Sequence, residues 1–141
     1  YLSDIIGVRI VTQYIEDVYA IVNIIKNHYQ VIEEIDYIKK PKASGYRSFH
    51  LIINHPIRKN GNFPITESIP IEIQIRTMGM DFWASLEHSI IYEPTKNPDQ
   101  TDLYNNDIMD LAYKELSSYA DDIFSIDMRI QALKHIVKAK T

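Results

Sequence analysis

Hydrophobic and polar residues follow regular spacings along most of this chain, and the spacings define its elements. Residues 5–11 form a β-branched run with one glycine and one arginine, which predicts a buried strand. In residues 15–29, apolar side chains recur every three or four positions after an acidic first turn, the pattern of an amphipathic helix. Residues 30–38 predict a second strand, and its charges place it at an edge of the sheet.

A loop follows at residues 39–46, stiffened by Pro41 and turned at Gly45. The remaining predicted elements are strands at 48–54 and 69–76 and helices at 78–92, 101–124 and 126–138. Strand, helix, a meandering set of strands and then helices is typical of an α/β domain of the α+β type, with a mixed β-sheet, rather than of a doubly wound fold.

The composition of the chain argues against several classes of protein. The 141 residues are 45% hydrophobic and 24% charged, as in a soluble globular domain. No apolar run approaches the roughly 20 residues of a membrane span. Cysteine is absent, which excludes disulfides and thiolate zinc sites, and the net charge of −4 argues against general nucleic-acid binding. The chain enters its first strand without a methionine, so we expect it to be a piece of a longer protein.

The segment at residues 72–76 places acid, amide and base on one face of a strand. Glu72, Gln74 and Arg76 alternate with isoleucines, so the polar side chains share one face and the isoleucines the other. An acid in a predicted central strand is costly to bury unless something satisfies it. Asp4 stands at the mouth of the first strand, and two carboxylates on neighbouring strands can share Mg²⁺. The alternative for Asp4 is a solvated strand end.

A short basic and aromatic loop precedes the third strand. Tyr46 could present a flat ring to a base beside the permissive Gly45, or could pack over the sheet edge. Lys42 and Arg47 could neutralise phosphates, or could be solvated. His50 could donate to a phosphate or ribose oxygen, although a lone histidine at a strand start is more often structural. Together with the polar strand, the loop indicates a site for a purine nucleotide and a metal.

Two further charged residues need partners. Arg9 lies in an apolar strand and needs a carboxylate, a phosphate or an aromatic plane to face. Asp81 begins the helix at 78–92, as a first-turn acid or as an acceptor for a purine's ring N–H and amino group. The sequence contains no Walker loop, no GxGxxG and no nucleophile elbow.

Five segments, in order, resemble the synthetase domain of the RelA/SpoT homologues, and specifically the small alarmone synthetases. They are 4–9 (Asp-Ile-Ile-Gly-Val-Arg), 36–38 (Asp-Tyr-Ile), 42–50 (Lys-Ala-Ser-Gly-Tyr-Arg-Ser-Phe-His), 72–77 (Glu-Ile-Gln-Ile-Arg-Thr) and 80–88 (Met-Asp-Phe-Trp-Ala-Ser-Leu-Glu-His). The resemblance implies a nucleotidyltransferase-like sheet that transfers pyrophosphate from ATP to the 3′-hydroxyl of GDP or GTP, which gives AMP and (p)ppGpp in the stringent response.

The resemblance also implies roles for individual residues. Asp4 and Glu72 would hold Mg²⁺, and Glu72 would accept the 3′-hydroxyl proton. The guanine nucleotide would be bound by Tyr46, Lys42, His50, Ser44 and Asp81, with Tyr46 stacked on the base. Arg9 would lie against the adenine of ATP. Supporting roles would fall to Gln74, Arg76 and Arg47.

The resemblance further predicts a cytoplasmic protein with a catalytic core at residues 1–93 and a helical extension at 94–141. The extension either helps to assemble a homotetramer, as in the small alarmone synthetases, or packs on the chain's own sheet. The basic residues that the family places before Asp4 to meet the ATP phosphates are absent from this sequence. A non-catalytic guanine-nucleotide or alarmone-binding module therefore remains an alternative, as does an enzyme that pyrophosphorylates RNA 3′ ends.

Overall fold

A four-stranded mixed sheet forms the centre of the protein, in the order β1-β4-β3-β2. The structure is a computed structural model and describes residues 6–57, 67–95 and 106–140. β1 runs parallel to β4, whereas the β4–β3 and β3–β2 pairs are antiparallel. The strands are β1 (Ile6–Thr12), β2 (Gln30–Asp36), β3 (Phe49–Ile57) and β4 (Glu67–Thr77). The mixed sheet and the edge position of β2 are confirmed.

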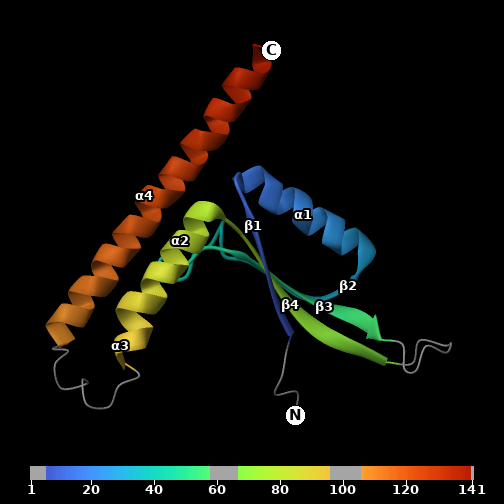
Figure 1. The fold of residues 1–141 in the computed structure, drawn as a ribbon, viewed down its shortest axis with the longest axis horizontal. Helices are drawn as coiled ribbons and strands as arrows, with labels where there is room; N and C mark the ends of the chain where they lie inside the picture. Colours follow the sequence, from blue (N-terminus) through green and yellow to red (C-terminus); the bar gives the residue numbers. More distant parts are fainter. Residues whose placement is uncertain (1–5, 58–66, 96–105, 141) are drawn as a thin grey trace.

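Helices border the sheet in two groups. The helical elements are α1 (Ile15–His28), α2 (Met78–Glu87), a π-helical turn (His88–Tyr92), α3 (Glu93–Thr95) and α4 (Asn106–Ala139). Figure 1 shows α1 to the right of β1, and α4 running alongside α2 to the left of it. None of the helices in the described ranges combines the length and the hydrophobicity needed to span a membrane.

The main core lies between α1 and the sheet. Leu51, Ile73 and Ile75 project from β3 and β4 and are buried against Val18 and Val22 of α1. Because side chains alternate along a strand, burying the isoleucines of β4 turns its polar residues to the opposite face. That opposite face carries the candidate site.

A smaller core joins α2 to α4. Trp83 of α2 is buried with Leu116 and Ala120 of α4, and its indole Nε1 donates to the Leu116 carbonyl at 2.6 Å. Near the other end of α4, Lys134 Nζ and His135 Nε2 each lie 2.7 Å from the Glu16 carboxylate at the start of α1. The long helix is therefore attached to both helical groups.

Two predictions about elements were wrong. The two helices predicted at 101–124 and 126–138 form one continuous helix from residue 106, because this stretch contains no proline or glycine to end a helix. The first strand was predicted to be buried, yet Ile6 and Val8 are exposed. β1 lies at the edge of the sheet, and it is Ile10, near its end, that packs against the core.

Candidate active site

The polar residues of β4 form a hydrogen-bonded row. Gln74 Nε2 donates to Glu72 Oε1 at 3.1 Å, and Arg76 Nη2 donates to Gln74 Oε1 at 2.5 Å. The Arg76 side chain is only 2% exposed, so its charge acts in a poorly solvated position. The predicted alternation is confirmed, and the row fixes the direction of the Glu72 carboxylate.

The loop before β3 brings aromatic and basic side chains to the same face. A 2.7 Å hydrogen bond joins Tyr46 Oη to His50 Nε2, and Lys42 Nζ lies 5.0 Å from the centroid of the Tyr46 ring. His50 Nδ1 lies 3.8 Å from Glu72 Oε1, which links the loop to the polar row. Burial lowers the pKa of His50, and Lys42 and Arg76 act in the same direction while Glu72 opposes them. A neutral His50 is therefore favoured at pH 7.

Tyr37 is a member of this cluster to which the sequence analysis gave no role. Its ring meets the His50 ring edge-on at 5.1 Å and the Tyr46 ring at 6.0 Å, and Lys42 Nζ lies 5.0 Å from its centroid. Tyr37 directly follows β2, the strand paired with β3. Tyr37 lies in segment 36–38, which resembles the family, and this was the only hint of a role in the sequence. Its contact with His50 follows from the pairing of β2 with β3.

The row and the loop open into one cleft of about 460 Å³. This volume is within the usual range for a small-molecule site, roughly 300–1,000 Å³. The predicted residues on its wall are Arg9, Lys42, Ser44, Tyr46, His50, Glu72, Gln74 and Arg76. Residues separated by as many as 67 positions in the sequence, Arg9 and Arg76, thus meet at a single site.

The far wall of the cleft comes from α2 and from the π-helical turn that continues it. Ala84, Glu87, His88 and Tyr92 line it. Burial raises the pKa of the Glu87 carboxyl, while a hydrogen bond with the Ser44 side chain and the nearby Lys42 charge oppose this rise. Glu87 was not among the predicted site residues, although its position three residues after Ala84 places both on one helix face.

Asp81 does not line the cleft beside Tyr46. Its Oδ1 lies 3.6 Å from Arg76 Nε and 3.8 Å from Arg9 Nη1, so it faces two cations. It borders a neighbouring hollow of about 390 Å³, which Arg9 also lines. The structure thus gives Asp81 two arginine partners and places Glu87, rather than Asp81, beside the loop that carries Tyr46.

Arg47 is also not placed in the cleft. Arg47 turns towards α4, where its Nη2 donates to Asp121 Oδ1 at 3.2 Å. The prediction that it meets phosphates is therefore not supported, because successive side chains of the loop point to opposite sides. Asp4 lies outside the described residues.

Comparison with known proteins identifies the fold and its family. Residues 1–97 match the family described as "Region found in RelA / SpoT proteins". The chain belongs to the RelA/SpoT family. It is 39% identical over 136 residues to GTP pyrophosphokinase YwaC of Bacillus subtilis, a match that covers 95% of this chain and 59% of that protein.

Solved structures of RelA/SpoT relatives agree with this assignment. Small alarmone synthetase 2 from Bacillus subtilis has a TM-score of 0.76 at 37% identity, covering 92% of this chain and 64% of that one. Small alarmone synthetase 1 from the same species, bound to its product pppGpp, has a TM-score of 0.75 at 27% identity, covering 94% and 62%. The chain therefore spans less than two thirds of the length of each of these three relatives.

The donors in the cleft are suited to magnesium. Glu72 offers a carboxylate held in place by Gln74, and Mg²⁺ is usually bound by one or two carboxylates together with substrate phosphates. Within residues 6–57, 67–95 and 106–140, no group of three or more histidine or acidic side chains is assembled for a metal. The Glu72 carboxylate would therefore suit a magnesium ion only if the remaining ligands were phosphate oxygens and water.

Proposed function

We propose that the protein is an ATP-dependent GTP/GDP 3′-pyrophosphokinase that makes (p)ppGpp. The observation that carries the proposal is the cleft itself, which is lined both by the row of Glu72, Gln74 and Arg76 and by the ring of Tyr46. The similarity to YwaC, a GTP pyrophosphokinase, supports the same reaction. The direct test incubates the full-length protein with Mg²⁺, ATP and GDP or GTP, and separates AMP and the 3′-pyrophosphorylated product by anion exchange.

The acceptor nucleotide would bind against the loop. Guanine stacks on Tyr46, whose ring borders the cleft, and Lys42 supplies a cation for the phosphates. Neutral His50 donates a ring N–H to a phosphate or ribose oxygen. We assign Glu87 to the Watson–Crick edge of guanine, because a carboxylate accepts from both the ring N–H and the amino group that guanine presents.

The chemical step requires mainly that the 3′-hydroxyl and the ATP phosphates be held in position. The 3′-oxygen of the acceptor attacks the β-phosphorus of ATP, the bond from that phosphorus to the α–β bridging oxygen breaks, and AMP leaves with the electron pair. Glu72 accepts the hydroxyl proton as the new bond forms. A magnesium ion, when bound, would neutralise the phosphate oxygens. Buried Arg76 adds a fixed positive charge where negative charge develops.

ATP would approach from the β1 side. Arg9 pairs with Gln74 in the β1–β4 register and borders both the cleft and the hollow that contains Asp81. Its side chain is 59% exposed, so the guanidinium is available to lie against an adenine ring. ATP and the guanine nucleotide would then meet beside Glu72, and we place the enzyme in the cytoplasm, where both nucleotides are abundant.

Glu87→Gln should reduce selectivity for guanine. Glutamine keeps one acceptor but adds a donor, so we expect GDP to bind about 5- to 150-fold more weakly, the range for losing a good bidentate base contact. Inosine diphosphate lacks the amino group, so its affinity should fall less than that of GDP. Isothermal titration with each nucleotide measures both effects, and Glu34→Gln on exposed β2 is the matched control.

The same variant should change the pH dependence of binding. Burial raises the pKa of Glu87, so on acidification its carboxylate is protonated at a higher pH than that of an ordinary glutamate. The protonated carboxyl no longer accepts two hydrogen bonds from guanine. GDP affinity should therefore decline as pH falls through this raised pKa in the natural protein, and the decline should be absent in Glu87→Gln. An unchanged pH profile would remove Glu87 from base recognition.

We also propose that α4 assembles the protein into a homotetramer. Ile126, Ile130, Leu133 and Val137 recur every three or four residues and are exposed. Residues 106–125 carry five acids and one lysine, whereas residues 126–139 carry one acid and three basic residues, of which Lys134 already pairs with Glu16. Two antiparallel copies of α4 would thus pair opposite charges beside the apolar stripe.

Leu133→Glu should dissociate this assembly. A charge in the middle of a buried apolar stripe is unfavourable, so we expect the tetramer to give way to smaller species at micromolar concentration. Sedimentation velocity measures the change, and Met128→Glu places the same charge on another side of α4 as a control. If both variants sediment as the natural protein does, the stripe is not the interface.

A further inference from the structure

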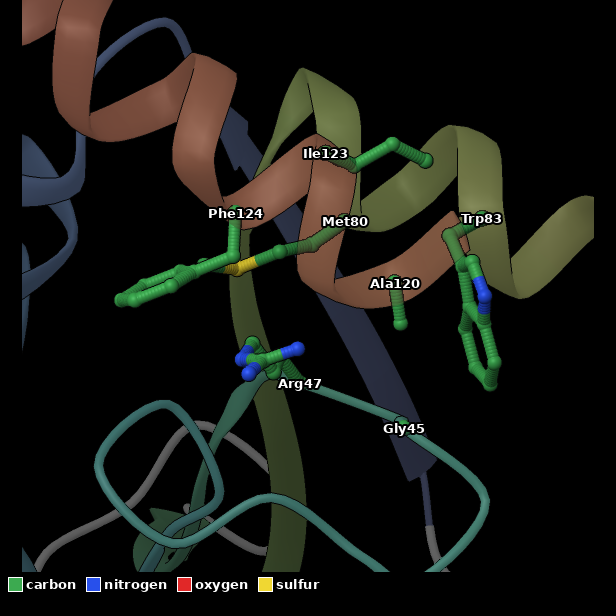
Figure 2. A pocket seen from close by; sticks show the side chains of 7 residues that line it. All are labelled: Gly45, Arg47, Met80, Trp83, Ala120, Ile123 and Phe124. Atoms are coloured by element: carbon green, nitrogen blue, oxygen red, sulfur yellow. The ribbon is translucent and has the colours of Figure 1, made fainter. Parts of the chain in front are cut away.

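The loop that carries Tyr46 has a second face, which is turned towards α4. Tyr46 and His50 line the cleft. Figure 2 shows the other face, where Gly45 and Arg47 line a small cavity under α4 with Ala120 and Phe124. This cavity has a volume of about 10 Å³. That is room for about one water molecule, so a phosphate group does not fit beside the Arg47 guanidinium.

Gly45 brings the loop unusually close to α4. A Cβ at this position would lie 2.7 Å from Ala120 Cβ and 3.2 Å from the Cα of Ser117, distances that require something to move. Gly45 also has φ of +101°, a conformation that other residues rarely adopt. The backbone beside Tyr46 is therefore packed directly on the helix, with no side chain between them.

Arg47 fills the rest of this contact. Its side chain is 11% exposed, its guanidinium carbon lies 4.6 Å from the centroid of the Phe124 ring, and its Nη2 lies 3.2 Å from Asp121 Oδ1. In the part of the chain that the structure describes, its Nε and Nη1 are buried without a hydrogen-bond partner. Burying so polar a group is costly, so a purely apolar side chain would suit stability alone better.

Within the described residues, the backbone of the loop makes few hydrogen bonds to other elements near Tyr46. The Lys42 amide donates to the Tyr46 carbonyl at 3.1 Å and the Tyr46 amide to Ser44 Oγ at 3.3 Å, so these bonds close the loop on itself. Ser48 Oγ donates to the Ile75 carbonyl at 3.2 Å and fixes the start of β3 to β4. The Tyr46 ring contacts His50, Tyr37 and Trp83, and α4 adds contacts to the peptide on either side of Tyr46, through Gly45 and Arg47.

We propose that Arg47 is a positioning residue that uses α4 to hold Tyr46 in the orientation for stacking on the guanine base. The proposal rests on the proposed function. It assigns a role to α4, which begins at residue 106, beyond the family match that ends at residue 97. Arg47 touches no substrate, and it acts through the adjoining peptide that carries Tyr46.

The test uses the full-length protein with Arg47→Met, Arg47→Lys and the exposed control Arg129→Met. Arg47→Met should raise the KM for GDP and GTP about tenfold, part of the loss expected when a base–aromatic stack is removed. The KM for ATP and the kcat at saturation should stay within about twofold, because positioning of the base does not alter the chemical step. Arg47→Lys should be intermediate, because lysine keeps the charge over Phe124 but not the planar fork.

A second variant, Asp121→Asn, keeps the proposal testable if Arg47→Met does not fold. Asp121 is 73% exposed, and Asp121→Asn should raise the guanine-nucleotide KM up to about threefold, the scale of a surface ion pair. Emission of Trp83, the single tryptophan, reports whether α4 remains docked on α2. Equal changes in both KM values, or no change in the KM for guanine nucleotides in folded Arg47→Lys and Asp121→Asn, would overturn the proposal.

Direct measurement of GDP binding tests the role of Arg47 independently of the proposed enzymatic reaction. The Kd of fluorescently labelled GDP is measured for each variant without ATP. If the natural protein binds GDP but forms no AMP, the synthetase assignment fails, and the comparison of Kd values between Arg47→Met and Arg129→Met still decides the role of Arg47. A tenfold weaker Kd in the first alone supports the positioning role, and equal Kd values reject it.

Discussion

Glu72→Gln should eliminate synthesis while leaving guanine-nucleotide binding nearly intact. Glutamine retains an oxygen that accepts the hydrogen bond from Gln74, so the row on β4 can persist. It cannot accept the 3′-hydroxyl proton, and it is a poor ligand for magnesium. Loss of a general base alone typically costs about 10²–10⁴-fold, and a weakened metal site adds to that loss. AMP formation in a single-turnover assay measures the chemical step directly.

The matched control for this variant is Glu67→Gln. Glu67 begins the same strand and is exposed, so its substitution changes the same charge outside the cleft. We expect turnover to stay within about twofold of the natural value, as for most surface substitutions. Turnover retained in Glu72→Gln would remove both the proton-acceptor and the metal-ligand roles from Glu72.

The local patterns of the sequence predict much of this site. Period-two alternation over Ile71 to Arg76 predicts which side chains share a face, and the structure confirms it through the bonds that join Glu72, Gln74 and Arg76. The glycine and aromatic residues of the loop predict its exposure to a ligand. These features depend on neighbours in the chain, so a single sequence contains them.

Features that depend on pairing between distant elements could not be predicted in the same way. The β1–β4 register brings Arg9 beside Gln74, and Asp81 faces Arg9 and Arg76 because α2 begins directly after β4. The packing of α4 sends Arg47 away from the cleft. Helical spacing predicts an apolar face for α4 but not the partner it covers.

The division of the chain into residues 1–93 and 94–141 stays a prediction. The family match ends at residue 97, near this boundary, but α4 contributes Leu116 and Ala120 to the core around Trp83. By position in the sequence, α4 is an extension of the family core. By packing, it is part of the same folded unit, and it contacts the loop of the site through Arg47.

Tyr46→Ala should weaken GDP binding by about 1–3 kcal/mol, the range for losing a base–aromatic stack, which is about a 5- to 150-fold rise in Kd. The ring is half-buried, and burial raises the pKa of its hydroxyl, so Tyr46 stays neutral and presents an uncharged face to the base. Isothermal titration with GDP measures the effect. ATP affinity should change little, because Arg9 and not Tyr46 would contact the adenine.

Tyr46→Phe separates the ring from its hydroxyl. Phenylalanine keeps the stacking face but loses the 2.7 Å bond to His50, so we expect a rise in Kd of at most about tenfold, the scale of one neutral hydrogen bond. If the alanine and phenylalanine variants weaken GDP binding equally, the hydroxyl and His50 carry the affinity rather than the stack. If neither variant changes the Kd while both lower the melting temperature, Tyr46 serves the packing of the loop against Tyr37 and Trp83 and not the nucleotide.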